Sequence, residues 1–321
     1  MKALVTGAAG FIGSTLSKQL LSEGHNVLGI DNFSDYYSSE LKFANIANLD
    51  SDSFELIRAD LNDINLDEYV KDVDYIFHLA GQPGVRSSWG TSFGTYIAHN
   101  VMATQKLLEA SMKSANLKKF IYASSSSVYG EASRYPCSET DITNPLSPYG
   151  VTKLAGENLC TLFGRNFGLP TVSLRYFTVY GPGQRPDMAF TRFLRAGLRD
   201  EEIHIYGSGQ QIRDFTFISD VVRANLLAAE SACIPGSVFN VAGGTNVSVS
   251  EVLDIVEQLL GHPLKVHKTK SIPGDVSQTG GSIEKISSDL GWKPEVQLVQ
   301  GLDAQRLWVI NSLNQGHEIK D

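Results

Sequence analysis

A glycine-rich turn stands between the first apolar run and the first helical pattern of this 321-residue chain. The apolar run covers residues 2–6, the helical pattern covers residues 11–22, and the turn carries Gly7, Gly10 and Gly13. Gly7 and Gly10 allow a tight turn, and Gly13 allows the helix to pack closely on the strand. The helix N-terminus then presents free N–H groups, which are suited to binding the pyrophosphate of a dinucleotide.

Apolar runs and helical patterns alternate through the first half of the chain. Buried strands are predicted at residues 2–6, 26–30, 54–58, 75–80, 120–124 and 172–175. Helices are predicted at residues 11–22, 96–114 and 149–167. This alternation indicates a parallel sheet with helices on both faces. We therefore expect an α/β fold with a Rossmann-type doubly wound parallel sheet, whose ligands bind at the carboxyl ends of the strands.

The alternation becomes irregular after residue 175. Gly and Pro are frequent at 180–186, and two further helices are expected at 219–230 and 248–260, each opened by a serine cap. We predict an NAD-binding domain of residues 1–176 with a returning segment at about 213–241. Residues 177–212 and 242–321 are expected to form a smaller C-terminal α/β lobe that binds the substrate.

An acidic residue follows the second predicted strand. Asp31 lies at about the distance from the glycine-rich turn at which a carboxylate meets the ribose of a bound dinucleotide. A carboxylate in this place repels a 2′-phosphate. The expected cofactor is therefore NAD rather than NADP.

Tyr149 and Lys153 are four residues apart at the start of a predicted helix, so both lie on one face. A surface pair has the same spacing, but here it accompanies a dinucleotide fold. A free tyrosine has a pKa near 10, and we expect the Lys153 ammonium and an oxidised nicotinamide to lower the pKa of Tyr149. Tyr149 could then accept a proton from a hydroxyl whose carbon loses a hydride.

Four consecutive serines, 124–127, end the strongly apolar strand at 120–124. The carboxyl end of that strand is where we expect the substrate, so the four hydroxyls are predicted to face it. No Asp or Glu interrupts this run.

Charge and cysteine content exclude several classes of protein. The net charge is −8, without a clustered basic stretch, so nucleic acid is not expected as a partner. The three cysteines are scattered, so neither a disulfide framework nor a metal site is expected. We see no signal peptide and no apolar stretch of membrane-spanning length, so a cytoplasmic protein is expected.

These motifs resemble those of the extended short-chain dehydrogenase/reductase superfamily, which contains the NAD-dependent epimerases and dehydratases, over nearly the whole chain. The shared markers are the three glycines, His78-Leu79-Ala80-Gly81, the serines 124–127, Tyr149-x-x-x-Lys153, Arg213-Asp214-Phe215-Thr216-Phe217-Ile218-x-Asp220 and Pro273-Gly274-Asp275. The resemblance implies an enzyme that holds NAD tightly and acts on a nucleotide sugar.

Ser126 and Ser127 separate the activities within this superfamily. Sugar 4,6-dehydratases carry Asp-Glu at these two positions, and UDP-glucuronate decarboxylases keep a Glu at the position of Ser127. An epimerase needs no second acid, because hydride leaves C4 of the sugar, the 4-keto sugar rotates, and hydride returns to its other face. The resemblance therefore implies a nucleotide-sugar 4-epimerase.

Two longer stretches, RYFTVYGPGQRPDMAF at 175–190 and GVRSSWG at 84–90, resemble the bacterial UDP-glucuronate 4-epimerases. UDP-glucose 4-epimerases usually carry Asn where this chain has Thr178. The expected reaction is the interconversion of UDP-glucuronate and UDP-galacturonate with bound NAD. A 4-epimerase of UDP-glucose or UDP-N-acetylglucosamine, a UDP-glucuronate decarboxylase and a non-catalytic NAD sensor remain alternatives.

A uronate substrate brings a chemical risk, because its carboxylate lies β to the transient C4 ketone and β-keto acids readily lose carbon dioxide. Neutral hydroxyls of Ser126, Ser127 and Thr178 can hold the carboxylate by hydrogen bonds without supplying an acid. Arg185 is expected to pair either with this carboxylate or with the pyrophosphate.

The resemblance also assigns individual roles. Ser125 is expected to bond the C4 hydroxyl beside Tyr149, and Phe177 to lie under the nicotinamide. The expected catalytic residues are Tyr149, Lys153 and Ser125. The expected cofactor-binding residues are Gly7, Gly10, Phe11, Ile12, Gly13, Asp31, Asn32, Asp60, Leu61, Leu79, Ala80, Gly81, Tyr149, Lys153 and Tyr176. The expected substrate-binding residues are Arg86, Ser125, Ser126, Ser127, Tyr149, Phe177, Thr178, Arg185, Arg213 and Asp275.

The resemblance further implies a homodimer, formed through the predicted helices 96–114 and 149–167. The chain departs from the superfamily at two places. Gln82 replaces a lysine that UDP-glucose epimerases have near the nicotinamide ribose, and Gly280-Gly281-Ser282 stands where Ala-Asp is frequent.

Overall fold

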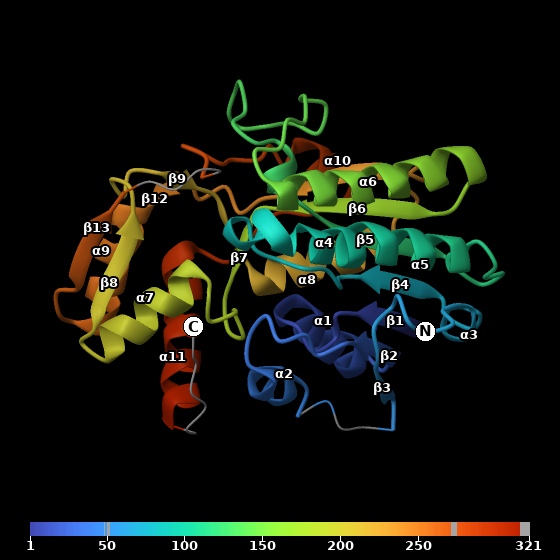
Figure 1. Ribbon diagram of the computed structural model, residues 1–321, viewed down its shortest axis with the longest axis horizontal. Coiled ribbons are helices and arrows are strands. Elements are labelled where there is room, and N and C mark those ends of the chain that lie inside the picture. The colour runs from blue at the N-terminus through green and yellow to red at the C-terminus, as the bar shows by residue number, and fades with distance from the viewer. Residues whose placement is uncertain (48, 50–51, 271–274, 315–321) are drawn as a thin grey trace.

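A seven-stranded parallel sheet forms the centre of the structure, which is a computed structural model that describes residues 1–47, 49, 52–270 and 275–314 (Figure 1). The strand order is β11-β6-β5-β4-β1-β2-β3. The strands are β1 (Lys2–Thr6), β2 (Asn26–Asp31), β3 (Phe54–Arg58), β4 (Tyr75–His78), β5 (Lys119–Ser125), β6 (Thr171–Tyr176) and β11 (Ser237–Val241). All pairings are parallel, which confirms the predicted doubly wound sheet.

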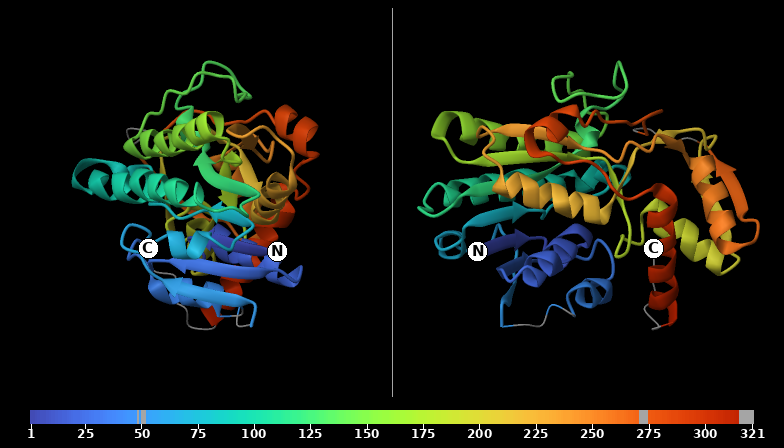
Figure 2. Two further views of the ribbon diagram at one scale, coloured as in Figure 1. Left: turned by 90° about the vertical axis from the view of Figure 1, so that its right-hand side faces the viewer. Right: turned by 180° about the vertical axis from the view of Figure 1, so that it is seen from behind.

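Helices cover both faces of this sheet, and each face has its own apolar cluster (Figures 1 and 2). One cluster joins the sheet to α1 (Phe11–Ser22), α8 (Ile218–Glu230) and α10 (Glu284–Leu290). The other cluster joins it to α3 (Asp67–Val70), α5 (Ala103–Ser111) and α6 (Pro148–Phe167). The inner strand β5 is buried along its whole length, as expected for a strand covered on both faces.

The second lobe lies beyond the carboxyl ends of the strands (Figure 1). Its apolar cluster includes residues of α7 (Ala189–Leu198), β8 (Glu202–Tyr206), α9 (Val249–Leu260) and α11 (Leu298–Asn314), together with Leu41 of α2 (Ser39–Ile46). Three two-stranded sheets connect its segments. They pair β7 (Thr178–Tyr180) with β10 (Phe215–Phe217), β9 (Ile212–Arg213) with β12 (Val247–Ser248), and β8 with β13 (Lys265–Thr269).

Two of the predicted helices differ from the structure. The predicted helix 96–114 consists of the end of α4 (Phe93–Tyr96), a π-helical segment η3 (Ile97–Met102) and α5. Ser248 caps α9, as predicted, and the structure adds a capping box with Glu251. Ser219 does not cap α8, because that helix already begins at Ile218 with Phe217 as its N-cap.

The C-terminal lobe is less separate than the predicted boundary implies. Ile286 and Trp292 are fully buried in the cluster beneath the main sheet, although the prediction placed 242–321 in the substrate lobe. Pro273 and Gly274 lie outside the described residues. None of the helices within the described ranges is long and apolar enough to cross a membrane.

Candidate active site

The glycine-rich turn leads directly from β1 into α1. Gly10 is the N-cap of α1 and provides no side-chain cap, so the first N–H groups of the helix remain available to an anion. Gly7 has a φ of +71°, and a Cβ on Gly13 would lie 2.1 Å from the Gly7 carbonyl oxygen. The backbone here therefore requires glycine, and it forms a cradle of the kind that holds a pyrophosphate.

A cleft of about 970 Å³ opens above this turn. It is lined by most of the residues predicted to bind the cofactor, namely Gly7, Gly10, Phe11, Ile12, Gly13, Asp31, Asn32, Asp60, Leu61, Leu79, Ala80 and Gly81. These residues come from the ends of β1, β2, β3 and β4, which meet at one edge of the sheet. Their arrangement fits a dinucleotide.

Asp31 is engaged by the backbone around it. Its carboxylate accepts the N–H of Ala9 at 3.0 Å and the N–H of Phe33 at 2.8 Å, and thereby ties the glycine-rich turn to the end of β2. The buried Lys42 lies 4.0 Å from the same carboxylate and donates to the Ser34 carbonyl at 2.8 Å. Burial lowers the pKa of Lys42.

Several residues of this cleft were not predicted. Lys42, Tyr37 and His99 also line it. His99 lies 3.1 Å from Asp60, which also accepts the amide of Asn32 at 2.8 Å. These side chains come from α2, from η3 and from loops, where no motif marks them.

Tyr176 and Phe177 were predicted to meet the ligands, but their side chains lie elsewhere. The Tyr176 hydroxyl donates to Asn225 at 2.9 Å inside the core. Phe177 is 1% exposed and packs in a small cluster with Tyr129 and Cys137 rather than on the lining of either cleft. A Cβ on Gly281 would lie 2.6 Å from the Phe177 ring, which explains the glycine at this departure from the superfamily pattern.

Tyr149 lies in the first turn of α6, which begins at Pro148 under a cap from Ser147. The Ser147 hydroxyl accepts the N–H of Gly150 at 3.1 Å. The Ser125 side chain lies near the phenol of Tyr149 and lowers its pKa. One turn later, Lys153 donates from Nζ to the Ala123 carbonyl at 2.8 Å. A Cβ on Gly81 would lie 3.3 Å from this Nζ, so Lys153 reaches the wall of the cleft.

The electrostatics of this pair differ from the prediction. Burial raises the pKa of Tyr149 overall, and the groups that lower it are the Ser125 hydroxyl and the charge of Arg185. Burial also lowers the pKa of Lys153 to about 8. The expected lowering of the Tyr149 pKa by Lys153 was therefore wrong for the structure, because burial acts on both groups and the nearby cation is Arg185.

The four serines differ in their surroundings. Ser125 lies near the Tyr149 phenol, and its Oγ accepts the N–H of Ser127 at 3.1 Å. Ser126 and Ser127 are half-buried in the 3₁₀ turn η4 (Ser126–Val128). Ser124 instead donates to the buried Glu157 at 2.6 Å, so the prediction that all four hydroxyls face the substrate was wrong. Side chains alternate along a strand, which turns Ser124 away from Ser125.

A second cleft of about 770 Å³ lies in the smaller lobe. It brings together the predicted residues Arg86, Thr178, Arg213 and Asp275. Arg213 contacts Asp275 at 2.7 Å and Arg86 contacts it at 3.7 Å. The lining residues Arg192, Tyr206 and Gln211 were not predicted, since they come from α7, from β8 and from the following loop.

Arg185 connects the two clefts. It lines the first cleft and forms a two-fold hydrogen bond, at 2.9 Å and 2.9 Å, with Asp187, which lines the second. Its guanidinium carbon lies 5.7 Å from the ring centre of Tyr36. This position allows it to reach either a sugar substituent or a phosphate, so the two predicted roles stay open.

The described residues contain no group of three or more His, Cys, Asp or Glu side chains arranged to hold a metal ion. The chemistry available here comes from the phosphate cradle and the arginines of the two clefts, and from the nearby residues Tyr149, Ser125 and Lys153.

Known proteins match this arrangement over nearly the whole chain. Residues 3–242 match the model of the NAD dependent epimerase/dehydratase family. An "Uncharacterized UDP-glucose epimerase YtcB" of Bacillus subtilis is 44% identical over 98% of this chain and 100% of its own length. The UDP-glucuronate 4-epimerase of Thermodesulfobacterium geofontis is 35% identical over 95% of each chain.

A solved structure agrees with the sequence relatives. The UDP-glucuronic acid 4-epimerase of Bacillus cereus, in complex with UDP-glucuronic acid and NAD, is 45% identical, with a TM-score of 0.94 over 97% of this chain and 99% of that one. The protein described here therefore belongs to the NAD dependent epimerase/dehydratase family, among its NAD-dependent nucleotide-sugar 4-epimerases.

Proposed function

We propose that the protein is a UDP-glucuronate 4-epimerase that interconverts UDP-glucuronate and UDP-galacturonate. The observation that carries this proposal is that the hydroxyl residues Ser126, Ser127 and Thr178, rather than acids, follow the ends of β5 and β6. Ser125 pairs in register with Tyr176, so Ser126, Ser127 and Thr178 follow the ends of adjacent strands. A uronate carboxylate held there receives hydrogen bonds and meets no acid.

Proton transfer in the proposed reaction depends on Tyr149, with Ser125 and Lys153 beside it. NAD, when bound, accepts hydride from C4 of the sugar and returns it to the opposite face. Tyr149 accepts the proton of the C4 hydroxyl while Ser125 holds that hydroxyl by a hydrogen bond. Arg185, whose charge lowers the pKa of Tyr149, favours the phenolate.

The two clefts divide the remaining binding between them. The glycine-rich turn and Asp31 would hold the pyrophosphate and adenosine ribose of NAD, and Lys153 would meet its nicotinamide ribose. Arg86 and Arg213 would hold the phosphates of UDP, and Asp275 its ribose. Since both arginines contact Asp275, they are already directed into the same cleft.

The alternative substrate is UDP-glucose. The relative from Bacillus subtilis is named a UDP-glucose epimerase, although Thr178 and Arg185 favour a charged substituent at C6. A test is to incubate the purified protein with UDP-glucuronate or with UDP-glucose, without added cofactor, and to identify the products. We expect faster conversion of UDP-glucuronate, to UDP-galacturonate. Faster conversion of UDP-glucose would contradict the proposed substrate, and a UDP-pentose with carbon dioxide would indicate a decarboxylase.

Replacing Thr178 by Val should separate the two substrates. The change removes one hydroxyl and keeps the shape of the side chain. A hydrogen bond to a charged group contributes about 1.5–3 kcal/mol, so kcat/KM for UDP-glucuronate should fall by roughly 10- to 100-fold. The value for UDP-glucose should change by less than about threefold, because that substrate places no charge there. An equal loss for both substrates would remove Thr178 from carboxylate recognition.

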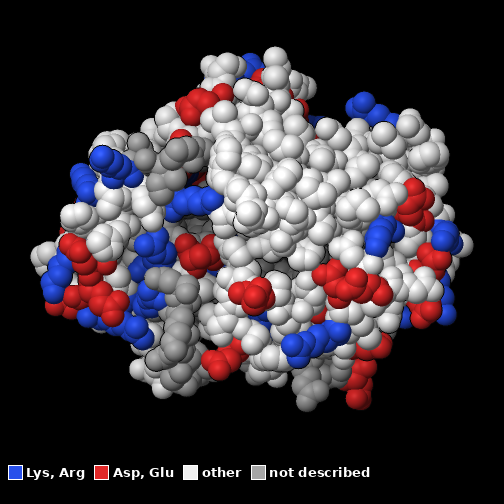
Figure 3. Space-filling model, in the orientation of Figure 1, with Lys and Arg blue, Asp and Glu red and all other residues white. Residues whose placement is uncertain are grey.

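We further propose a homodimer through η3, α5 and α6. These elements present exposed apolar side chains, including Ile97, Met102, Val151, Leu162 and Phe167. Figure 3 shows a broad area with few charged side chains over this face of the molecule. A contiguous apolar surface is typical of a protein interface. Sedimentation should therefore give about twice the subunit mass of 35.0 kDa. A monomer at micromolar concentration would contradict the proposal. The cytoplasmic location stays a prediction from the sequence.

A further inference from the structure

Arg175 and Glu157 form an ion pair inside the core, between the sheet and helix α6. Arg175 Nη2 lies 2.6 Å from Glu157 Oε1, and Arg175 Nε lies 2.9 Å from Oε2. The two side chains are only 5% and 3% exposed. Two parallel hydrogen bonds of this kind fix the relative orientation of both groups.

Further polar groups satisfy both ends of the pair. Ser124 donates to Glu157 Oε2 at 2.6 Å. Arg175 Nη1 donates to the Tyr129 hydroxyl at 2.7 Å, and this hydroxyl donates to Asn240 at 2.7 Å. The Arg175 guanidinium also lies over the Tyr129 ring, 4.7 Å from its centre. The cluster thus joins β5, β6, β11 and α6.

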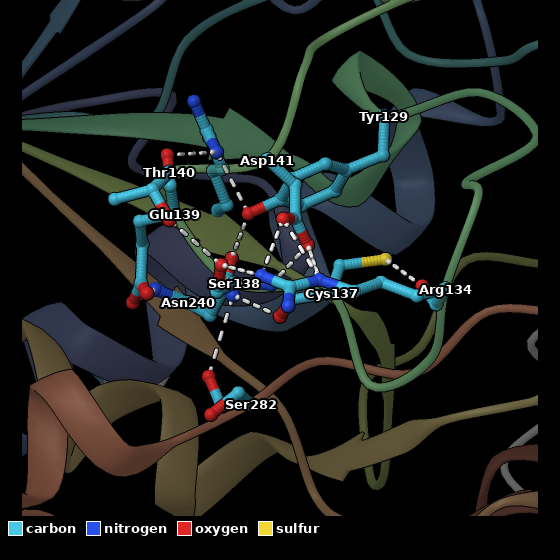
Figure 4. Close-up of polar contacts among 10 residues, drawn as sticks. Tyr129, Arg134, Cys137, Ser138, Glu139, Thr140, Asp141, Asn240 and Ser282 are labelled. Carbon is cyan, nitrogen blue, oxygen red and sulfur yellow. Dashed lines mark hydrogen bonds and ion pairs between the residues drawn. The ribbon is translucent and has the colours of Figure 1, made fainter.

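The cluster continues into the loop between β5 and α6, which Figure 4 shows with Asn240 and Ser282. Asn240 donates from its side chain to the Cys137 carbonyl at 2.9 Å and from its backbone to Glu139 at 2.8 Å. The loop that leads into the catalytic helix is therefore attached to the same group of side chains.

The Arg175–Glu157 pair is linked to the active-site residues through α6 and β5. Tyr149, Lys153 and Glu157 are spaced four residues apart on α6, and thus lie along one face of the helix. Ser124 and Arg175 are direct neighbours across β5 and β6, and both reach Glu157. The residue after Ser124 is Ser125, which lies near the Tyr149 phenol and lowers its pKa.

Helix α6 lies very close to β5 and the serine turn. A Cβ on Gly156 would lie 2.2 Å from the Tyr122 hydroxyl, and one on Gly150 would lie 2.6 Å from the Ser127 carbonyl oxygen. The two glycines permit this approach but do not by themselves set how far the helix slides along the strand. The directional hydrogen bonds that Glu157 accepts can set the position of α6 along the strand.

Stability alone is a poor explanation for this ion pair. Removing two charges from water is costly, and well-packed apolar side chains often give a core that is equally stable. Apolar contacts, however, have no preferred direction. We propose that Arg175 and Glu157 are positioning residues, which hold α6 in register with β5 so that the Tyr149 phenol meets Ser125 and the substrate. The proposal rests on the proposed role of Tyr149 as the base.

The test compares Glu157→Gln with the parent protein as purified with its NAD, using whichever UDP-sugar the parent epimerises faster. Gln keeps the size of the side chain but cannot accept both bonds from Arg175. We expect kcat to fall by roughly 10- to 100-fold, the range that a displacement of up to about 1 Å can cause. KM and NAD content should change by less than about twofold.

Two further variants separate positioning from stability. Asp141→Asn is the matched control, because it breaks an exposed ion pair with Arg134 in the same loop and should leave kcat unchanged. The double variant Glu157→Met with Arg175→Met leaves no unpaired charge. It should unfold near the parental temperature and still show the low kcat. It also carries the test if Glu157→Gln does not fold.

A parental kcat in the double variant, or in a folded Glu157→Gln protein, would overturn the positioning role. So would an equal loss of kcat in the Asp141→Asn control. Full activity of the Tyr149→Phe variant would instead contradict the proposed function. The two failures are therefore distinguishable.

Discussion

Replacing Tyr149 by Phe should lower kcat for epimerisation by roughly 10²- to 10⁴-fold, the range that general acid–base catalysis contributes. The change removes one oxygen, and the ring stays packed edge-on against Tyr96, with ring centres 6.3 Å apart. The pocket should therefore keep its shape. We expect KM for the UDP-sugar and the NAD content of the purified protein to remain within about threefold of the parental values.

The measurement is the initial rate of epimer formation, together with the absorbance of reduced nicotinamide after mixing with substrate. Both signals should fall together, because no other group takes the proton from the C4 hydroxyl. Tyr69→Phe, on α3 and away from both clefts, is the matched control and should retain the parental rate. Persistent epimerisation in the Tyr149 variant would exclude the phenol as the base. The parental rate itself should increase with pH, because burial raises the pKa of Tyr149 and only the phenolate accepts a proton.

The sheet and the dinucleotide cleft could be predicted from sequence for a local reason. Buried parallel strands appear as continuous apolar runs, and the ligand groups follow those runs directly. The glycine-rich turn, Asp31 and the residues after His78 therefore came together as expected. Lys42 and His99 reach the same cleft from helices whose own sequence gives no sign of it.

Burial and long-range pairing account for the features that could not be predicted. The i, i+4 spacing of Tyr149 and Lys153 is local, but the direction in which the Tyr149 pKa moves depends on burial and on Arg185, which is 36 residues later in the chain. Ser124 looks equivalent to its three neighbours until Glu157 is known to lie beneath it. Ser219 resembled a helix cap because α8 begins only one residue earlier.

Replacing Lys153 by Met should stabilise the NAD-free protein at pH 7 while it abolishes most activity. Lys153 is 6% exposed, and burial lowers its pKa from 10.5 to about 8. This difference corresponds to about 3 kcal/mol of unfavourable free energy in the folded state when the group is charged. In the parent, the hydrogen bond from Nζ to the Ala123 carbonyl offsets part of this cost. We therefore expect Met to raise the free energy of unfolding by about 1–3 kcal/mol.

The pH dependence identifies the cause. Below about pH 8 the lysine is charged in both the folded and the unfolded protein, so the cost of its burial is fully present. Between about 8 and 10.5 the folded protein loses the proton while the unfolded chain keeps it, so the parent becomes more stable as pH rises. The advantage of the Met variant should therefore be largest at pH 7 and disappear near pH 10.5.

Denaturant unfolding of both proteins after removal of NAD, across this pH range, measures the difference directly. Lys106→Met, at a half-buried lysine on α5, is the control for the general effect of replacing a lysine by Met. A gain that does not depend on pH would mean that Met acts by packing alone. If the gain follows the predicted window and activity is lost, Lys153 is retained at a cost in stability because the reaction requires this side chain.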